Sequence, residues 1–380
     1  MSHSRPQQSF RLTAGRCDEG SLTLSSTPAP RFEFSAAILR TPRAPLEIAT
    51  VTFDGPLAPG QVLVEMAFSG ICGKQLDEIA ERSGPDPWLP HMLGHEGSGK
   101  VVACGSGVTK VRPTDPVVLH WQEGSGLSAD TPLYQMGDER INAGAITTFN
   151  EYAVVPENRV TKITDGVDLK TACLFGCVAT TGTGTVFNDA AVQAGQSLAV
   201  IGCGGVGLCA ILAAVTAGAN PIIAIDTRSE ALRSAAEFGA HHVINATQSN
   251  VTDAVRELTD GHGARNVIVT AASTAALQDG CAAASAPSQV IMAGVPPAGE
   301  TITISSLDVH RGKSITGSYG GGTFPDRHIP EYMELHKSGR LPYSKLIAKV
   351  IPLSQINDGI DAVQKSLAGR CVIDFQADRL

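Results

Sequence analysis

Three residues that commonly bind transition metals, Cys72, His95 and Cys177, stand far apart in the sequence. Cys72 closes a segment that begins with the apolar run 61–68, and His95 has an acid, Glu96, beside it. Two thiolates and one imidazole fill three of the four positions of tetrahedral zinc and leave the fourth open. An open position is typical of a catalytic zinc, because it can take a substrate oxygen. The alternative is that each side chain simply packs in the interior, as isolated cysteines often do.

A glycine-rich turn offers a second kind of chemistry. The turn follows the apolar run 197–201, precedes the helical run 208–214, and reads Gly202, Cys203, Gly204, Gly205, Val206, Gly207. In a strand–turn–helix unit, the first glycine permits a tight turn, the second lets the backbone approach a pyrophosphate, and the third lets the helix pack on the strand. The new helix would direct its N–H groups and positive dipole end at the phosphates. The pattern predicts a dinucleotide site, with a turn that binds nothing as the alternative.

The acid that ends the next apolar run indicates which dinucleotide binds. Asp226 follows the run 221–225 and lies 19 residues after Gly207. A carboxylate at that distance can accept hydrogen bonds from both hydroxyls of the adenosine ribose. Because it would also repel a 2′-phosphate, NAD is favoured over NADP. Arg228 weakens this preference, since a nearby arginine can accommodate the phosphate.

The elements that must position these residues differ between the first and second parts of the chain. Residues 1–34 are rich in Ser, Pro, Thr and Gln, and we interpret them as a flexible N-terminal extension. Short β-like runs follow, separated by turns that contain Gly and Pro, at 34–39, 46–53, 61–68, 99–103 and 116–120. These runs predict a compact β-rich domain.

From about residue 180, strand-like and helical segments alternate. The expected helices include 229–238 and 251–259, and the expected buried strands include 243–244, 267–270 and 290–293. Such alternation specifies a parallel sheet with helices on both faces. The last segment lies too far along the chain to join this sheet, so we expect it to return to the first domain.

Length and composition set outer limits on the function. A chain of 380 residues suits two domains, and a net charge of −8 argues against nucleic acid or an anionic membrane as partner. No apolar run approaches the ~20 residues that span a bilayer, and the first residues lack the apolar core of a secretory signal. Nine cysteines at irregular intervals do not suggest a disulfide framework. A cytoplasmic protein with thiols available for metal is expected.

Taken in chain order, these motifs resemble the zinc-dependent medium-chain dehydrogenase/reductase superfamily, specifically its alcohol dehydrogenase branch. The resemblance covers about residues 36–375, nearly the whole folded chain. It implies a doubly wound Rossmann domain for NAD over 180–319 and a GroES-like catalytic domain formed by 35–179 and 320–380. The segments that carry it are Gly70-Ile71-Cys72, Gly94-His95-Glu96-Gly97, Gly176-Cys177 with Thr181-Gly182, Gly202 to Gly207 with Asp226, and Ala293-Gly294-Val295-Pro296-Pro297.

The resemblance also implies roles for individual residues. Cys72, His95 and Cys177 would hold one catalytic zinc, with Glu96 as a partner of the ligands or an alternate ligand. Thr181, Ala293 and Val295 would lie along the nicotinamide half of NAD. The implied reaction is reversible hydride transfer between an alcohol and NAD, which gives an aldehyde or ketone. Members of the family are mostly dimers or tetramers joined through an edge strand, for which the candidate is 314–319.

The chain departs from the family pattern in two places. Many members hold a structural zinc with four cysteines after the catalytic histidine, but no cysteine lies between Cys104 and Cys173, so none is expected. The second departure is at the reaction centre, where the family often places a hydroxyl residue and then an aspartate. This chain has Lys74 and Gln75 there. The usual hydroxyl for proton transfer is therefore missing.

Lys74 allows three interpretations. Beside a zinc ion, the ammonium would have its pKa lowered by like charge and could act as a general acid or base, or donate to the bound oxygen. It could instead turn away and pair with Asp77 or Glu78. A third possibility is that it binds an anionic group of the substrate, with help from Arg327 or His328.

The substrate is weakly specified. The segments 120–148 and 320–322 are expected to shape the pocket, and their polar character favours a polyhydroxy or otherwise polar alcohol. The side chains concerned are His120, Trp121, Gln122, Asn142, Thr147 and Thr148. Alternatively, these side chains only form hydrogen bonds within the loop. The competing functions are a sugar or polyol dehydrogenase of the same superfamily, a zinc-free quinone or enoyl reductase, and an NAD-binding protein without enzymatic activity.

Overall fold

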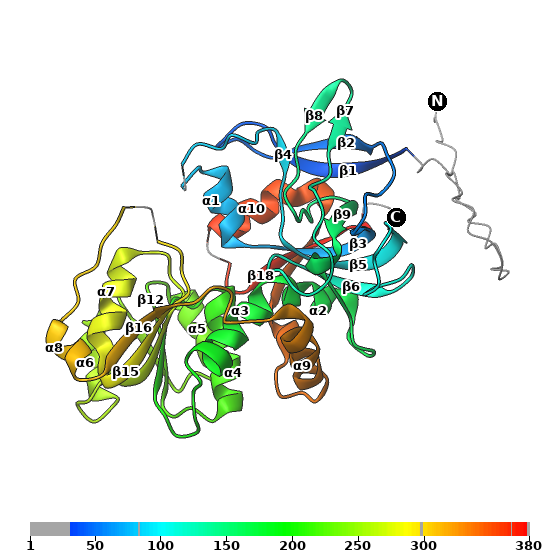
Figure 1. Ribbon diagram of the computed structural model, residues 1–380. Helices are drawn as coiled ribbons and strands as arrows, with labels where there is room; N and C mark the ends of the chain where they lie inside the picture. The colour runs from blue at the N-terminus through cyan, green and yellow to red at the C-terminus, as the bar shows by residue number, and fades with distance from the viewer. Residues whose placement is uncertain (1–30, 83, 297–298, 366, 378–380) are drawn as a thin grey trace.

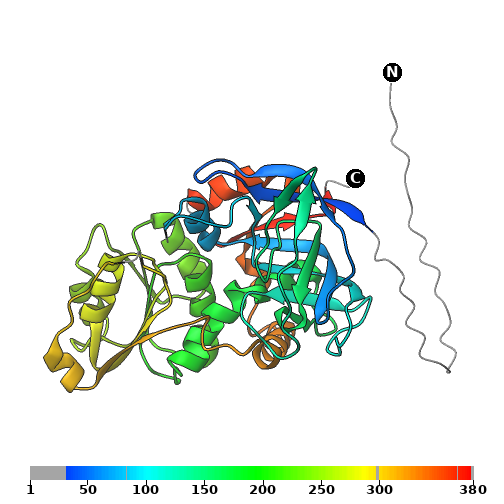
Figure 2. The same ribbon diagram turned by 45° about the horizontal axis from the view of Figure 1, so that its top comes forward.

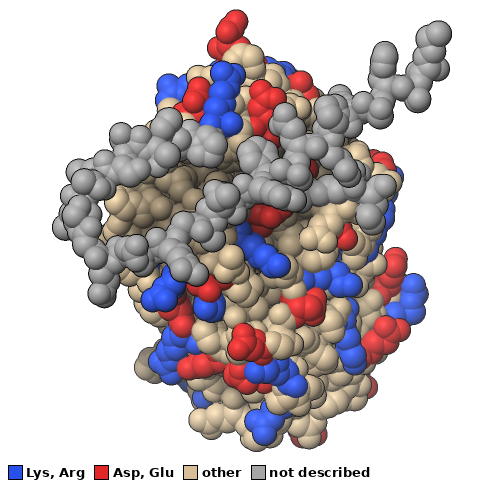
Figure 3. Space-filling model, turned by 90° about the vertical axis from the view of Figure 1, so that its right-hand side faces the viewer, with Lys and Arg blue, Asp and Glu red and all other residues tan. Residues whose placement is uncertain are grey.

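An antiparallel β-rich lobe and a parallel-sheet lobe lie side by side in the computed structural model (Figures 1 and 2). The structure describes residues 31–82, 84–296, 299–365 and 367–377. Most of the expected extension lies outside this part of the chain, but strand β1 (Phe32–Leu39) begins two residues before the expected first strand. Within the described residues, no helix has the length and apolar character needed to cross a membrane. The face in Figure 3 carries acidic and basic side chains interspersed.

Two sheets form the β-rich lobe. The first orders its strands β4 (His91–Met92), β1, β2 (Glu47–Phe53), β7 (Tyr134–Met136) and β8 (Glu139–Ile141). The second orders them β10 (Val160–Lys162), β6 (Pro116–His120), β5 (Glu96–Cys104), β3 (Gln61–Ile71), β18 (Arg370–Asp374) and β17 (Ile347–Pro352), and β9 (Tyr152–Pro156) also pairs with β3. Because β18 runs antiparallel to β3, with Cys371 opposite Ile71, the end of the chain returns to this lobe.

The other lobe is a six-stranded parallel sheet. Its strand order is β13 (His242–Asn245), β12 (Ile222–Asp226), β11 (Leu198–Ile201), β14 (Ala264–Val269), β15 (Ala284–Met292) and β16 (Lys313–Gly317). Alternate residues of β11 point to opposite faces, so Leu198 and Val200 enter one core and Ala199 and Ile201 another. These findings confirm the predicted α/β class, with a doubly wound Rossmann sheet beside a β-rich GroES-like domain.

Helices cover both faces of the parallel sheet. Residues of α4 (Gly205–Ala217) and α5 (Ser229–Glu237) pack on one face, and residues of α6 (Val251–Glu257) and α7 (Thr274–Ala283) pack on the other. The strand order extends outward in both directions from β11. Ligands of such sheets bind at this switch point, beyond the carboxyl ends of the strands.

Short helices join the lobes and carry part of their common core. The chain passes through α2 (Leu169–Ala172), η2 (Cys173–Gly176), α3 (Val178–Gly184) and the π-helix η3 (Thr185–Asp189). Phe175 and Val178 belong to the same buried cluster as Leu208 and Ile211 of α4. The other helices are α1 (Gly73–Ile79), α8 (Ser306–His310), α9 (Pro325–Lys337) and α10 (Ile356–Gln364), and short 3₁₀ turns are η1 (Glu157–Arg159), η4 (Tyr343–Leu346) and η5 (Leu353–Gln355).

A carboxylate ties the loop before β6 to the glycine-rich segment that follows it. Glu157 is buried and accepts hydrogen bonds from the backbone N–H groups of Thr109, Lys110 and Leu127 at 2.6, 2.7 and 2.7 Å. Burial alone would raise the pKa of Glu157, but these donors outweigh it and hold the pKa below its usual range. Asp326 of α9 adds a hydrogen bond from the N–H of Ser125. The segment is thus held by hydrogen bonds from backbone to carboxylate.

We expect Glu157→Gln to lower the free energy of unfolding by about 1.5–3 kcal/mol, because an amide nitrogen would face backbone donors that need an acceptor. A carboxylate whose folded pKa is depressed stabilises the protein above its unfolded pKa, near ~4.3, and that contribution is lost as pH falls through the folded pKa. Denaturation curves at pH 7 and below pH 4 should therefore show the difference from wild type shrinking with acid. Glu123→Gln, an exposed change in the same segment, is the control and should shift stability by less than about 0.5 kcal/mol. Equal effects of the two changes would contradict this account.

Candidate active site

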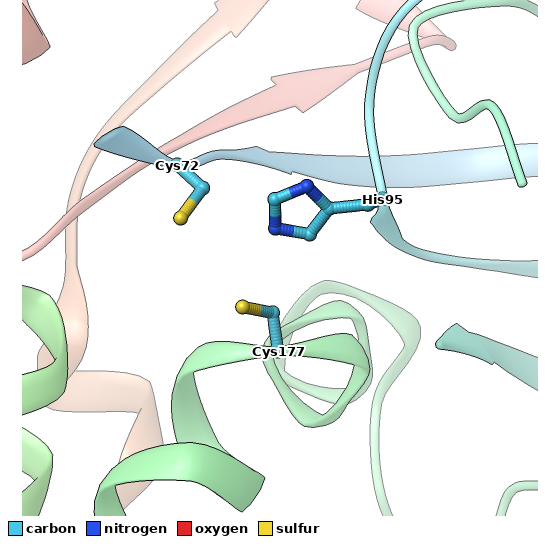
Figure 4. A group of neighbouring side chains, drawn as sticks. All are labelled: Cys72, His95 and Cys177. Carbon is cyan, nitrogen blue, oxygen red and sulfur yellow. The ribbon is translucent and has the colours of Figure 1, made fainter. Parts of the chain in front are cut away.

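The side chains of Cys72, His95 and Cys177 converge on one point between the lobes (Figure 4). Cys72 caps the start of α1, where β3 ends, and His95 immediately precedes β5. Cys177 occupies the junction between η2 and α3. One ligand atom from each residue lies within 4.8 Å of the others. Two sulfurs and one imidazole nitrogen at these separations fit a tetrahedral metal such as zinc with one position open.

The protonation of the two thiols also suits a cation. The hydrogen bond with Cys177 lowers the pKa of Cys72 well below its usual range, against the effect of burial, and the positive charge of Arg370 lowers it further. The same hydrogen bond and burial raise the pKa of Cys177. Both directions arise from one hydrogen bond, in which Cys177 donates to the sulfur of Cys72. A bound divalent cation would displace the remaining proton, because metals bind the thiolate.

A buried ion pair lies directly behind the three ligands. Glu96 is fully buried, and its Oε1 lies 2.7 Å from Nε of Arg370, whose side chain is 5% exposed. Oε2 of Glu96 accepts a hydrogen bond from the N–H of Val178 at 3.0 Å, next to Cys177. Two roles were expected for Glu96, a partner of the ligands or an alternate ligand, and its contacts favour the first. Its oxygens face Arg370 and Val178, which is the geometry of a partner.

Two glycines of the quoted motifs make room for this carboxylate. A Cβ on Gly70 would lie 1.9 Å from Oε1 of Glu96, and a Cβ on Gly176 would lie 2.7 Å from its Cα. Both distances are far below van der Waals contact. The glycines before Cys72 and Cys177 therefore allow the Glu96–Arg370 pair to sit against the ligand segments.

Gln75 connects two of the ligands. It is fully buried, its Oε1 accepts a hydrogen bond from the N–H of Cys72 at 3.0 Å, and its Nε2 lies 2.6 Å from Nδ1 of His95. Burial alone would lower the pKa of His95, but the hydrogen bond and charge of Cys72 outweigh it and raise the pKa. The amide thus fills the place where the family often has an aspartate.

Lys74 lies on α1, beside these ligands, and is half-buried. Asp77 pairs with Arg82 at 2.9 Å. Burial raises the pKa of Glu78, while the charges of His95 and Lys74 act to lower it, so Lys74 is a neighbour of Glu78. Arg327 pairs with Glu331 within α9, which lies apart from α1 in both views of the fold (Figures 1 and 2). His328 lies on the same helix, so the structure brings neither of these two residues beside Lys74.

The glycine-rich turn has the form that a pyrophosphate site requires. Gly202 has a φ of +96°, and a Cβ on Gly207 would lie 1.9 Å from the carbonyl oxygen of Gly202. A Cβ on Gly204 would meet nothing within 4 Å, so the backbone at the start of α4 is open to a ligand. Gly205 and Val206 form the first turn of α4, whose N–H groups lack partners within the helix. The turn therefore fits a bound phosphate group.

Asp226 is already engaged at the end of β12. Its oxygens accept hydrogen bonds from the N–H of Cys203 at 2.8 Å and from Nε and Nη2 of Arg228 at 3.0 and 3.1 Å. Burial alone would raise the pKa of Asp226, but these donors hold it below its usual range. Asp226, the carboxylate that was expected to bind ribose, therefore already forms an ion pair with the guanidinium of Arg228.

Three expected nicotinamide neighbours lie near this turn or on the helix after Cys177. Ala293 and Val295 follow β15, whose carboxyl end lies at the same edge of the sheet as Gly202, and Val295 is 63% exposed. Thr181 is half-buried on α3. Pro297 of the same motif lies outside the described residues.

A cavity of about 450 Å³ lies beside the segment that carries Cys177. It is lined by Trp121, Gln122, Glu123, Arg159, Tyr319 and Thr323. The N–H of Trp121 donates to the carbonyl of Gly176. The indole and the Tyr319 ring meet edge to face with centroids 4.8 Å apart. The lining thus combines two aromatic rings with polar side chains.

Of the six polar residues expected to shape the pocket, only Trp121 and Gln122 line this cavity. His120 bonds to the carbonyl of Gln122 and the hydroxyl of Thr161, and burial lowers its pKa to about 4. Asn142 donates to the carbonyl of Trp88, and Thr148 bonds to Ser69. The interpretation of a satisfied loop therefore fits His120, Asn142 and Thr148, whereas the buried hydroxyl of Thr147 has no hydrogen-bond partner among the described residues.

Reasoning from sequence missed the roles of two residues. Gln75 was noted only as a departure from the family pattern, and the polar residue three positions after Cys72 is the one signal that could have indicated its hydrogen bond to the N-cap. Arg370 carries no such signal in the sequence. It opens β18 and meets Glu96 across 274 positions, and no local pattern predicts such a pairing.

Comparisons with known proteins cover most of the chain. Residues 58–165 match the alcohol dehydrogenase GroES-like domain, and residues 205–338 match the zinc-binding dehydrogenase domain. An alcohol dehydrogenase class-3 of Cereibacter sphaeroides is 30% identical over 90% of this chain and 99% of its own length. An S-(hydroxymethyl)glutathione dehydrogenase of Paracoccus denitrificans is 30% identical over 89% and 98%.

Solved structures extend the comparison to the fold. An alcohol dehydrogenase zinc-binding domain protein of Burkholderia ambifaria has a TM-score of 0.85 at 29% identity, over 91% of this chain and 99% of that one. Benzyl alcohol dehydrogenase of Acinetobacter calcoaceticus has a TM-score of 0.82 at 28% identity, over 90% and 99%. Both lobes therefore have counterparts in the same solved chains.

Proposed function

Because the chain belongs to the zinc-dependent medium-chain dehydrogenase/reductase superfamily, we propose that it transfers a hydride reversibly between a polar alcohol and NAD. The observation that carries the proposal is the convergence of Cys72, His95 and Cys177 with one tetrahedral position left over. The open turn at Gly204 supports a dinucleotide as second reactant. Screening alcohols, polyols and their aldehydes or ketones for change in NADH absorbance tests it. Absence of turnover on the whole panel would count against it.

Each group near the site has a part in this proposal. When bound, zinc would supply a Lewis acid that lowers the pKa of the substrate hydroxyl, and NAD would accept the hydride. Cys72, His95 and Cys177 would hold the metal. Glu96 and Arg370 neutralise each other in an ion pair next to the ligands. The hydrogen bond from the N–H of Val178 to Glu96 fixes the position of the segment that carries Cys177. Lys74 would exchange the proton with the substrate oxygen.

The proposed role of Lys74 can be tested by substitution. Lys74→Ala should lower kcat by about 10²-fold or more and change its pH profile, because positioned acids and bases contribute about 10²–10⁴-fold. Steady-state kinetics from pH 6 to 10 measures both effects. Lys100→Ala, at an exposed position of β5, is the control. If kcat and its pH profile stayed as in the wild type, the proposed role of Lys74 would be wrong.

The choice between NAD and NADP is expected to depend on Asp226. Asp226 would repel a 2′-phosphate, whereas Arg228, once free of Asp226, would attract one. Asp226→Gly should therefore lower the ratio of kcat/KM for NAD to that for NADP by at least about tenfold. Parallel assays with the two cofactors give this ratio, and Asp226→Asn separates the charge from the shape. An unchanged ratio in both variants would remove Asp226 from the proposal.

The cavity lining supports a polar substrate. Gln122, Glu123, Arg159 and Thr323 offer hydrogen-bonding groups beside the rings of Trp121 and Tyr319. Pockets bind chiefly through apolar walls and take orientation from a few polar groups. We therefore place an alcohol with further polar groups ahead of a simple aliphatic one.

For the assembly we propose a homodimer or homotetramer joined through β16. This strand is an edge of the parallel sheet, so it has backbone groups available for pairing. Three apolar side chains nearby, Ile304, Leu307 and Val309, are 39%, 51% and 49% exposed. Sedimentation would distinguish these assemblies from a monomer.

A further inference from the structure

Gln75 is the residue whose contacts the proposed function leaves unexplained. It is completely buried, which is uncommon for a glutamine, and both ends of its amide point at metal-ligand residues. One end meets the backbone N–H of Cys72 and the other meets the ring of His95. Any change in this amide therefore reaches two of the three ligands.

The position of the proton on the His95 ring determines whether the ring needs the oxygen or the nitrogen of the Gln75 amide. Its Nε2 faces the two sulfurs, while Nδ1 lies against Gln75 (Figure 4). Nε2 can bind a metal only through its lone pair, so the proton of the neutral ring must then be on Nδ1. Nδ1–H is a donor and requires an acceptor. Among the atoms of an amide only the oxygen can accept, because the nitrogen only donates.

The single oxygen of Gln75 therefore has two competing donors. In this structure it accepts from the N–H of Cys72 at 3.0 Å, and the amide nitrogen lies 2.6 Å from Nδ1 of His95. That arrangement suits a ring whose proton is on Nε2. With the proton on Nδ1, a half-turn of the amide would satisfy His95 but set its nitrogen against the N–H of Cys72.

We propose that Gln75 is a positioning residue of the metal site, and that its one acceptor oxygen limits how tightly the site holds zinc. The inference rests on the proposed function, because it takes the three ligands to bind a metal. A carboxylate at this position would have an oxygen for each donor. Groups that accept from a metal-bound histidine fix its tautomer and orientation, and their loss typically weakens metal affinity about 10–100-fold.

A purely structural role of Gln75 would have different consequences when the residue is replaced. If Gln75 only capped α1 through the N–H of Cys72, its removal would destabilise the helix and leave the His95 ring unaffected. Either an amide or a carboxylate would serve as the cap. The zinc affinity of the folded protein separates the two roles, since capping alone does not require an acceptor at Nδ1.

The test uses the full chain, stripped of metal and titrated with zinc against a chromophoric chelator. The variants are Gln75→Met, which removes both ends of the amide at similar length, and Gln75→Glu, which supplies two acceptor oxygens. Asp77→Asn, on the same helix but paired with Arg82, is the control. Thermal unfolding of each metal-free variant shows whether it is folded. Ring ¹⁵N shifts of His95 with zinc bound report the Nδ1–H hydrogen bond.

We expect Gln75→Met to weaken zinc binding about 10–100-fold and Gln75→Glu to bind about tenfold more tightly than the wild type. The ¹⁵N shifts should change in Gln75→Met and not in Asp77→Asn. A folded Gln75→Met with wild-type zinc affinity would overturn the inference and leave the proposed function intact. So would a folded Gln75→Glu that binds zinc no more tightly than the wild type. If the wild type itself bound no zinc, the proposed function would fail as well.

Discussion

Replacing Cys72 with alanine is expected to abolish zinc retention and to lower kcat/KM by about 10³-fold or more. Two ligands cannot hold zinc as three do, and a Lewis acid at the substrate oxygen contributes several kcal/mol to transition-state stabilisation. The sulfur of Cys72 also accepts the hydrogen bond from Cys177 that lowers its pKa, so the substitution removes both a ligand and this contact. Metal analysis and steady-state kinetics on the same preparation give both quantities.

A matched control for this change is present in the chain. Cys104 is a free cysteine at the end of β5 and bonds to the carbonyl of Val111. Cys104→Ala should retain zinc and activity near the wild-type level. The assignment of Cys72 as a ligand would be contradicted if Cys72→Ala kept one zinc per chain or a kcat/KM within threefold of that of Cys104→Ala.

The second large effect is expected at Arg370. Arg370→Met should lower the free energy of unfolding of the metal-free protein by about 3–5 kcal/mol, because Glu96 would be left buried without its cation. Burial already raises the pKa of Glu96, and Arg370 is the main group that opposes this effect. Urea denaturation followed by circular dichroism measures the change.

A double variant separates the unpaired charge from lost packing. Glu96→Gln combined with Arg370→Met removes both charges, and we expect it to recover more than half of the lost stability. If Arg370→Met were as stable as the wild type, the ion pair would not support the structure. If the double variant were no better than Arg370→Met alone, packing rather than charge would explain the loss.

The fold could be predicted from sequence where the pattern is local. The run 116–120 is strand β6, and the alternation after residue 180 is the parallel sheet, because buried parallel strands are continuously apolar. The predicted ends of the helices and strands were less accurate. β3 continues to Ile71 rather than ending at 68, since β18 takes the place of β9 beside it from Phe68 onward, and that pairing is set by tertiary structure.

The site could be predicted where residue type alone specifies chemistry. Cysteine and histidine are metal ligands in any fold, so Cys72, His95 and Cys177 could be nominated before their geometry was known. The groups that support them could not. Glutamine and arginine are common residues without such a signature, and Gln75 and Arg370 gain their roles only through burial against the ligands.

The most direct test of the account is the metal content per chain of the purified full-length protein. The account predicts one zinc per chain, lost in Cys72→Ala and kept in Cys104→Ala. Absence of zinc after growth in zinc-supplemented medium would contradict it. Cys72, His95 and Cys177 would then be packing residues, and a zinc-free reductase or an NAD-binding protein without enzymatic activity would explain the chain better.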